Sequence, residues 1–151
     1  MRNWGAKPAL TPAQQYLFLS RSPLCPGTGS LSVAGLTWNY RVRPTPLSRE
    51  YAIQIRFQRD GTPMVFVTEP DISALANGRS IPHVYRDPLH LCLFLPRARE
   101  WDGTMRIDQT FVPWTEVWLY YFEEWLASDD WKGGGEHTPV PRNRKKRRAA
   151  A

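Results

Sequence analysis

A run of large apolar side chains near the C-terminal end, "PWTEVWLYYFEEWLAS" at residues 113–128, limits the possible folds more than any other stretch of this chain. Its apolar residues recur at the spacing of a helix with one apolar face. They are Trp114, Val117, Trp118, Tyr121, Phe122, Trp125 and Leu126. Pro113 suits the first turn of this helix. We expect the helix to pack on a sheet as part of the core, in preference to an aromatic face that binds a partner.

Strand patterns earlier in the chain predict that sheet. Apolar and polar residues alternate in "LTWNYRVR" (36–43) and in "EYAIQIRF" (50–57), as they do in strands with one buried face. The turn "RDGT", in which Asp60-Gly61 suits positive φ, precedes a third strand in "PMVFVTEP" (63–70). Short connections between sequential strands indicate an antiparallel meander.

Two further segments complete the predicted order. In "TPAQQYLFLS" (11–20), Thr11 is a plausible N-cap and Pro12 a first helical residue, so a short helix is expected. The stretch "RSPLCPGTGS" (21–30) is rich in Pro, Gly and Ser and is interpreted as a loop that contains Cys25. The fold class is α+β. A long irregular segment from about Glu69 to Asp108 remains, and connections of that length usually carry function.

Length and composition limit the class of protein. With 151 residues and 42% hydrophobic content, the chain is the size of one folded domain. Two cysteines do not make a disulfide framework, and no stretch has the pattern of a secretory signal or of a membrane span. We therefore expect a cytoplasmic protein in which Cys25 and Cys92 are thiols.

The net charge of +6 lies in one short stretch near the C-terminus. Six of the 20 basic residues crowd into "RNRKKRR" (142–148), which leaves 14 against 14 acidic residues elsewhere. Such a run repels itself and has nothing apolar to bury, so we expect a solvated tail and no nucleic-acid binding, although phosphates, anionic lipid or an acidic partner stay open as ligands. The predicted organisation is an N-terminal extension at 1–7, a domain at 8–138 and a disordered basic tail at 139–151.

The stretch "IPHVYRDPLHLCLFLP" (81–96) gathers His83, His90 and Cys92 inside the irregular segment. Three interpretations of Cys92 stay open on the residues alone. The leucines of "LCLFL" suit a buried thiol. Together with His137 the three residues offer four metal ligands, but they lack the paired spacing of a zinc site, so no metal is expected. As a nucleophile, Cys92 needs a cation or hydrogen bond that favours its thiolate, and His90 lies on the same side of an extended chain.

The order of residues around Cys92 resembles that of the ubiquitin-conjugating-enzyme (UBC) superfamily, in which a His-Pro-Asn motif precedes the active-site cysteine, a tryptophan follows it and a helix packs behind the site. His83 takes the place of the motif's histidine, Cys92 that of the nucleophile, and Trp101 that of the tryptophan. The resemblance covers roughly residues 8–138. It implies a UBC-like α+β fold, with an antiparallel β-meander packed against a C-terminal aromatic helix and a long irregular active-site segment.

In finer detail the chain is similar to the stand-alone bacterial conjugating enzymes of CBASS antiphage operons. Pro82-His83, Cys92, Glu100-Trp101, Pro113-Trp114 and Gly133-Gly134-Gly135 occur in the expected order. Those enzymes are encoded beside a cyclic-oligonucleotide synthase, the CD-NTase. The resemblance implies a thioester at Cys92, transfer of the CD-NTase C-terminus to an acceptor, and a regulatory role in antiphage signalling.

The resemblance also implies roles for individual residues. His83 holds the active-site loop, and His90 adjusts the Cys92 thiol or accepts a proton. Val84-Tyr85 stands where the motif has Pro-Asn, so oxyanion stabilisation passes to Tyr85, His90 or backbone N–H groups. On the substrate and partner side we expect Trp101, Gly133, Gly134, Gly135 and His137, the glycines because they let backbone come close to a ligand.

Two other functions stay open. One is a non-catalytic UBC-like binding module that holds a partner with its aromatic surface and basic tail. The other is a Cys-His hydrolase, which needs a base placed on Cys92. None of the ATP-binding fingerprints occurs in the chain, so we expect no cofactor, and both the source of activation and the acceptor nucleophile stay open.

Overall fold

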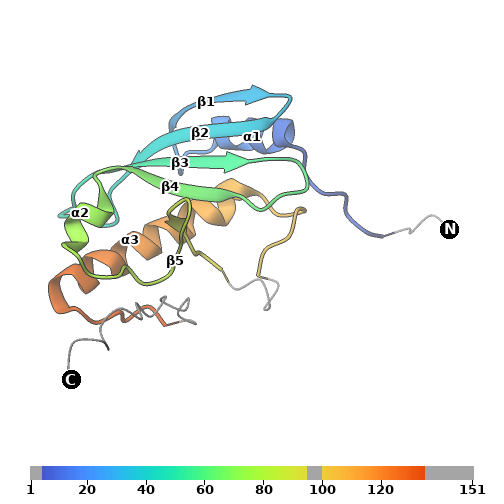
Figure 1. Ribbon diagram of the computed structural model, residues 1–151. Helices are drawn as coiled ribbons and strands as arrows, with labels where there is room; N and C mark the ends of the chain where they lie inside the picture. Colours follow the sequence, from blue (N-terminus) through green and yellow to red (C-terminus); the bar gives the residue numbers. More distant parts are fainter. Residues whose placement is uncertain (1–4, 95–99, 135–151) are drawn as a thin grey trace, which may run out of the picture.

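A computed structural model describes residues 5–94 and 100–134 of the chain (Figure 1). It is an α+β structure, as predicted. Its elements are α1 (Pro12–Arg21), β1 (Gly27–Ser32), β2 (Gly35–Val42), β3 (Tyr51–Phe57), β4 (Met64–Glu69), α2 (Ile72–Ala76), β5 (Val84–Tyr85), β6 (His90–Leu91), the 3₁₀ helix η2 (Ile107–Gln109) and α3 (Phe111–Ser128). The predicted basic tail at 139–151 lies outside the described residues.

The sheet is an antiparallel meander in the order β1-β2-β3-β4. The three predicted strands are confirmed, as is the turn at Asp60, whose φ is 60°. One prediction was wrong: the second half of "RSPLCPGTGS" is not a loop but the edge strand β1, which pairs with β2 from Gly27↔Tyr40 to Ser32↔Gly35. Glycine hides this strand from a sequence pattern. A side chain at Gly29 would bring its Cβ to 2.6 Å from the Trp38 ring, so only glycine fits there.

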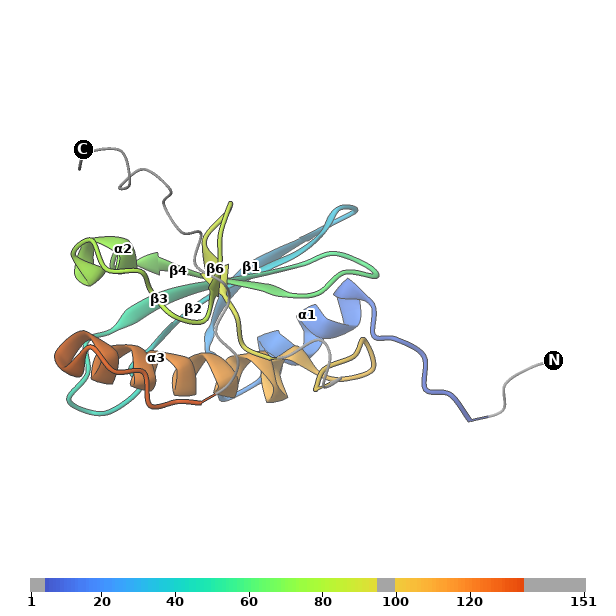
Figure 2. The same ribbon diagram turned by 60° about the horizontal axis from the view of Figure 1, so that its bottom comes forward.

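Both long helices cover one face of the sheet (Figure 2). The residues of β2 and β3 that point to this face are buried, and they are Leu36, Trp38, Tyr40, Tyr51, Ile53, Ile55 and Phe57. The opposite face is polar, with Gln54 hydrogen-bonded to Asn39 at 3.1 Å and Arg41 paired with Glu50 at 3.2 Å. The alternation predicted from the sequence therefore separates a helix-covered face from an open one.

Helix α3 has the predicted position, but its apolar stripe is divided. Trp118, Phe122 and Trp125 are buried in the core together with Leu119. Val117, in contrast, is 54% exposed, and Trp114 and Tyr121 are only partly buried. The expectation that the stripe is core throughout was therefore wrong. Residues at its edge point away from the sheet and toward the segment that contains Cys92.

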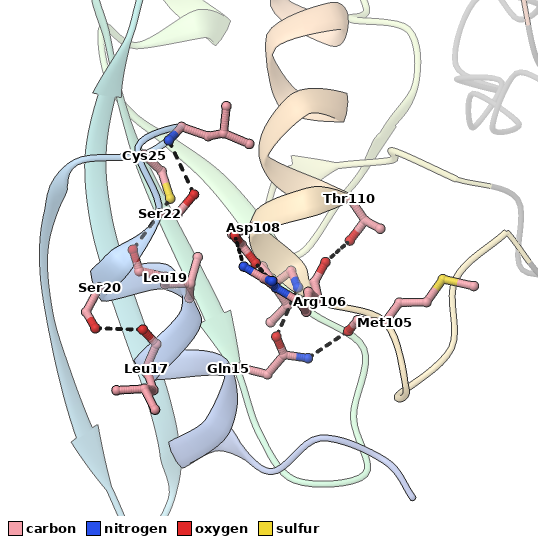
Figure 3. Close-up of polar contacts among 12 residues, drawn as sticks. Gln15, Leu17, Leu19, Ser20, Ser22, Cys25, Met105, Arg106, Asp108 and Thr110 are labelled. Carbon is pink, nitrogen blue, oxygen red and sulfur yellow. Dashed lines mark hydrogen bonds and ion pairs between the residues drawn. The ribbon is translucent and has the colours of Figure 1, made fainter. Parts of the chain in front are cut away.

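Helix α1 is held to the segment before α3 by a buried amide (Figure 3). The predicted cap is confirmed: the Thr11 side chain accepts from the Gln14 N–H at 3.2 Å, and Pro12 follows. From the buried face of this helix, Gln15 donates through Nε2 to the Met105 carbonyl at 2.8 Å and accepts from the Ile107 N–H at 2.9 Å. The bond to Ile107 is buried and the bond to Met105 is partly buried, and a buried bond left unmade costs about 1–3 kcal/mol.

The segment between Glu69 and Asp108 is less irregular than predicted. It contains the short helix α2 and a two-stranded hairpin, β5–β6, with register Val84↔Leu91 and Tyr85↔His90. Strand β6 lies against β4, and Figure 1 shows the hairpin beside the β4 edge of the sheet. Val84 and Leu91 fix it there, since both side chains are buried in the core. Along the described ranges, no helix is long and apolar enough to cross a bilayer.

Candidate functional site

Cys92 follows β6 directly, and its backbone is hydrogen-bonded to His83 of the neighbouring chain segment. Its N–H donates to the His83 carbonyl at 3.0 Å, which extends the β5–β6 pairing by one step. The same carbonyl accepts from the Trp118 indole Nε1–H of α3 at 3.0 Å. His83 has φ of 50°, a left-handed conformation that costs a non-glycine residue on the order of 1–3 kcal/mol. These two hydrogen bonds offset that cost and fix the peptide beside Cys92.

Tyr85 is the side chain that bears most directly on the Cys92 thiol. Side chains alternate along a strand, so Tyr85 and Cys92 project from the same face of the hairpin. Hydrogen bonding to Cys92, followed by partial burial, raises the pKa of Tyr85 to about 12. The phenol therefore keeps its proton at neutral pH. It can donate a hydrogen bond to sulfur or to an oxygen bound next to it.

The His90 ring lies beside Tyr85. Its ring stacks on Tyr85 with centroids 5.0 Å apart and contacts Phe66 of β4 at 5.8 Å. Nδ1 lies 2.7 Å from the Pro88 carbonyl, which only accepts, so we assign the proton of the neutral ring to Nδ1. This leaves Nε2 as an acceptor. His90 thus contacts Tyr85, which itself interacts with the Cys92 thiol, and a direct action of His90 on the thiol stays a prediction.

A cavity of about 280 Å³ opens at Cys92. We call it the Cys92 cavity. Its walls come from the Cys92 segment, from α3 and from the chain after α3, and its lining residues are His83, Cys92, Leu93, Phe94, Glu100, Trp114, Val117, Trp118, Tyr121, Trp131, Gly133 and Gly134. The half-buried Cys92 thiol is thus accessible next to a mostly aromatic surface.

The chain after α3 turns and runs back along that helix (Figures 1 and 2). Trp131 packs on the His83 ring at 5.2 Å and on Trp118 at 5.6 Å. A Cβ on Gly133 would lie 2.8 Å from the Tyr121 ring, so this position requires glycine. Gly133 and Gly134 line the same cavity as Cys92, and their contact with a partner stays a prediction. Gly135 and His137 lie outside the described residues.

A second cavity of about 560 Å³ lies on the Tyr85 side and shares Leu93 and Phe94 with the first. It is more polar, with Tyr85, Arg86, His90 and Asp102 among its lining residues. Trp101 also lines this second cavity, half-buried against Phe111 at 5.5 Å. Trp101 is thus near the site but does not line the cavity at Cys92.

Some site residues were not predicted as such. Trp114, Val117 and Tyr121 were assigned to the core, because helical spacing cannot tell which edge of an apolar stripe faces a cavity. No sequence pattern marked Trp131 as a site residue, apart from its position shortly before the glycines. Cys25, the other thiol, is fully buried in the core. Burial raises its pKa to about 11, so it stays protonated at neutral pH and is unsuited to nucleophilic attack.

The arrangement suits acyl transfer to sulfur. It offers the accessible Cys92 thiol and, within hydrogen-bonding reach of it, the protonated phenol of Tyr85. The His90 imidazole stacks on that phenol and has Nε2 as an acceptor. Among the described residues, no group of three or more His, Cys, Asp or Glu side chains is placed to hold a metal ion.

Comparison with known proteins identifies a family for the chain. A family model described as "Type II CBASS E2 protein" matches residues 15–138, which include every candidate residue named above. A search of curated proteins finds no match.

Proposed function

The chain belongs to the type II CBASS E2 family, and on that basis we propose that it is a conjugating transferase with a UBC-like fold that forms a thioester at Cys92. The observation that carries the proposal is the position of Cys92. It is the thiol that lines a cavity, and it lies on the same hairpin face as a phenol whose pKa is raised by hydrogen bonding to it. Cys25 is buried in the core and offers no alternative.

The reaction has two steps. In the first, the Cys92 thiolate attacks the carbonyl carbon of an activated C-terminal acyl group, and the activating group leaves with its bonding electrons. In the second, an acceptor nucleophile attacks the thioester carbonyl, the C–S bond breaks, and Cys92 leaves as thiolate. Each step passes through a tetrahedral intermediate with negative charge on oxygen, so a donor fixed next to the sulfur accelerates both steps.

Tyr85 is the proposed donor to that oxygen. It occupies the region where the related motif has Asn, and its raised pKa keeps it protonated. His90 is the proposed proton acceptor, because Nδ1 is bound to Pro88 and Nε2 is left to take a proton from an incoming amine. His83 is a positioning residue: its carbonyl holds the Cys92 N–H. The second cavity, lined by His90, Asp102 and Trp101, is the proposed approach for the acceptor.

The proposed donor is the operon's CD-NTase, which would be joined through its C-terminus and so be regulated. An acceptor amine is charged in water and must lose a proton to react, and this favours its approach through the second, more polar cavity. The Cys92 cavity is mostly apolar and suits the uncharged end of the acyl donor.

Co-expression of the protein with this CD-NTase tests the proposal. We expect an adduct of summed mass on a non-reducing gel, which thiol reductant removes. Cys92→Ala should abolish the adduct. Cys92→Ser should convert it to an oxygen ester that survives reductant and yields to hydroxylamine. Cys25→Ala is the matched control and should leave the adduct unchanged.

A CD-NTase that lacks its last residues separates the proposal from its alternatives. An adduct that forms equally well with this shortened partner, or with Cys92→Ala, would contradict thioester formation and favour the non-catalytic binding module. Release of free CD-NTase by water alone, with no acceptor modified, would favour the hydrolase.

A further inference from the structure

The walls of the Cys92 cavity indicate which acyl donor it accepts. Side chains from two elements line it with apolar surface: Trp114, Val117 and Tyr121 from α3, and Trp131 from the chain that returns along α3. Val117 is 54% exposed although valine gains from burial. An apolar residue that faces solvent on the wall of a cavity is well placed to be covered by a ligand.

The size of the cavity restricts what can enter. About 280 Å³ is near the lower limit of roughly 300 Å³ for small-ligand sites. A folded domain is excluded, whereas the end of an extended chain can enter. A chain that ends in glycines alone would leave the aromatic walls without contacts, and surfaces that lose their neighbours lose dispersion energy. The cavity is therefore matched to a side chain and not only to a backbone.

The position of the Cys92 sulfur determines which residue of the acyl donor places its side chain against the aromatic walls. Cys92 lines the same cavity as Val117 and Tyr121, so a carbonyl bound to Sγ begins at that wall. Consecutive Cα atoms are about 3.8 Å apart, and side chains of an extended chain alternate in direction. Only the last or the next-to-last residue of the donor can reach the aromatic walls from there.

The charge of the walls disfavours acidic donors. Within the described part of the chain, Glu100 is the one carboxylate or permanent cation in the lining of the Cys92 cavity. The second cavity instead carries Arg86, Asp102 and His90. Burial of a charged side chain against Trp and Tyr rings without a partner is costly, so an acidic donor end is disfavoured in the Cys92 cavity.

We propose that the acyl donor carries a bulky apolar side chain at one of its last two positions, and that Trp114, Val117 and Tyr121 select it. This rests on the proposed thioester at Cys92 and adds the identity of the donor end. The reaction needs no further reagent when the donor is itself a thioester: the Cys92 thiolate attacks the carbonyl, the new C–S bond forms, and the original thiol leaves as thiolate.

Short peptide thioesters of 2-mercaptoethanesulfonate test the proposal in the Cys25→Ala protein. A series ends in Gly-Gly, Leu-Gly, Phe-Gly, Gly-Phe or Asp-Gly, and intact-protein mass spectrometry follows acylation of Cys92. Each rate is divided by the rate of the same peptide with N-acetylcysteine, which removes its intrinsic reactivity. We expect at least one of the Leu and Phe peptides to exceed Gly-Gly about tenfold or more, as apolar pockets allow, and Asp-Gly to be slowest.

Val117→Asp should remove this preference, and because Val117 is exposed its replacement does not disturb the core. Val33→Asp is the matched control, because Val33 is a fully exposed valine at the turn between β1 and β2. Equal normalised rates for all peptides, or a fastest Asp-Gly, would overturn the proposed selectivity while Cys92 acylation stands. No acylation by any peptide, while N-acetylcysteine reacts, would contradict the thioester proposal itself.

Discussion

At the scale of single residues, the site depends on a phenol that stands next to a thiol. Sequence comparison with the conjugating-enzyme motif shows a missing Asn near Val84-Tyr85. In the structure, Tyr85 lies next to Cys92 and stacks on His90 at 5.0 Å, so its hydroxyl can serve where an amide would. The Tyr85 ring positions the hydroxyl by stacking on His90, and the hydroxyl is the proposed hydrogen-bond donor.

Replacement of Tyr85 by Phe separates these two contributions. Tyr85→Phe keeps the ring stacked on His90 and removes only the donor. We expect discharge of a preformed Cys92 thioester to an amine to slow by roughly 10²-fold, which is the cost of one lost oxyanion donor. Single-turnover measurement of thioester loss checks this. Tyr120→Phe removes an exposed hydroxyl elsewhere on α3 and should have no effect; an equal loss in both variants would exclude a specific role for Tyr85.

At the scale of elements, the hairpin β5–β6 and helix α3 form the site only because other elements fix them. The segment before α3 is tied to α1 by Gln15, whose amide bonds both Met105 and Ile107. At the other end of the helix, the Arg79 guanidinium stacks on Trp125 at 4.4 Å and donates to the Trp125 carbonyl at 3.4 Å. Both ends of α3 are therefore set by contacts distant in sequence.

The Gln15 contact predicts a large effect on stability. Gln15→Leu leaves the buried Ile107 N–H and the partly buried Met105 carbonyl without their partner, and a lost buried bond costs about 1–3 kcal/mol. We expect the free energy of unfolding to fall by about 2–4 kcal/mol in urea titration. Gln109→Leu, an exposed position on η2, should change it by less than about 0.5 kcal/mol. Equal stability of the two variants would show that the amide is not needed.

At the scale of the whole molecule, the core holds protons that the unfolded chain releases in base. Burial raises the pKa of Cys25 from 9.0 to about 11, and it raises the pKa values of Tyr40 and Tyr51 well above their ordinary value of 10.0. Groups whose pKa is raised by folding stabilise the protein fully below the unfolded pKa. That stabilisation is lost as pH rises through the folded pKa.

The free energy of unfolding should therefore decrease between pH 9 and pH 11. For Cys25 alone the difference in pKa corresponds to about 2–3 kcal/mol, because its thiol is fully buried. Cys25→Ala should lower stability at pH 7 through lost packing and should flatten the decrease above pH 9. Urea titrations at intervals of pH measure both effects. An unchanged slope in Cys25→Ala would contradict the assignment of this proton to Cys25.

The sequence by itself determined those elements whose pattern is a property of one segment. The alternation of β2 and β3, the cap of α1 at Thr11 and the helical period of α3 are all local, and all are present in the structure. The candidate nucleophile came from the sequence as well, through the spacing of His83 and Cys92 that resembles a known family, and its role stays a prediction. That resemblance and not the periodicity identified Cys92.

Only the tertiary structure shows which side chains face the core, which face a cavity and which lie next to one another. Periodicity shows that Val117 and Phe122 share an apolar stripe, but not that one faces a cavity and the other the core. It does not show that Tyr85 lies opposite His90, because this depends on hairpin register. Nor does it show that the chain after α3 returns to pack Trp131 on His83. The pattern of a segment specifies which of its residues share a face. The residues that pack on that face come from segments distant in sequence, so only the folded structure identifies them.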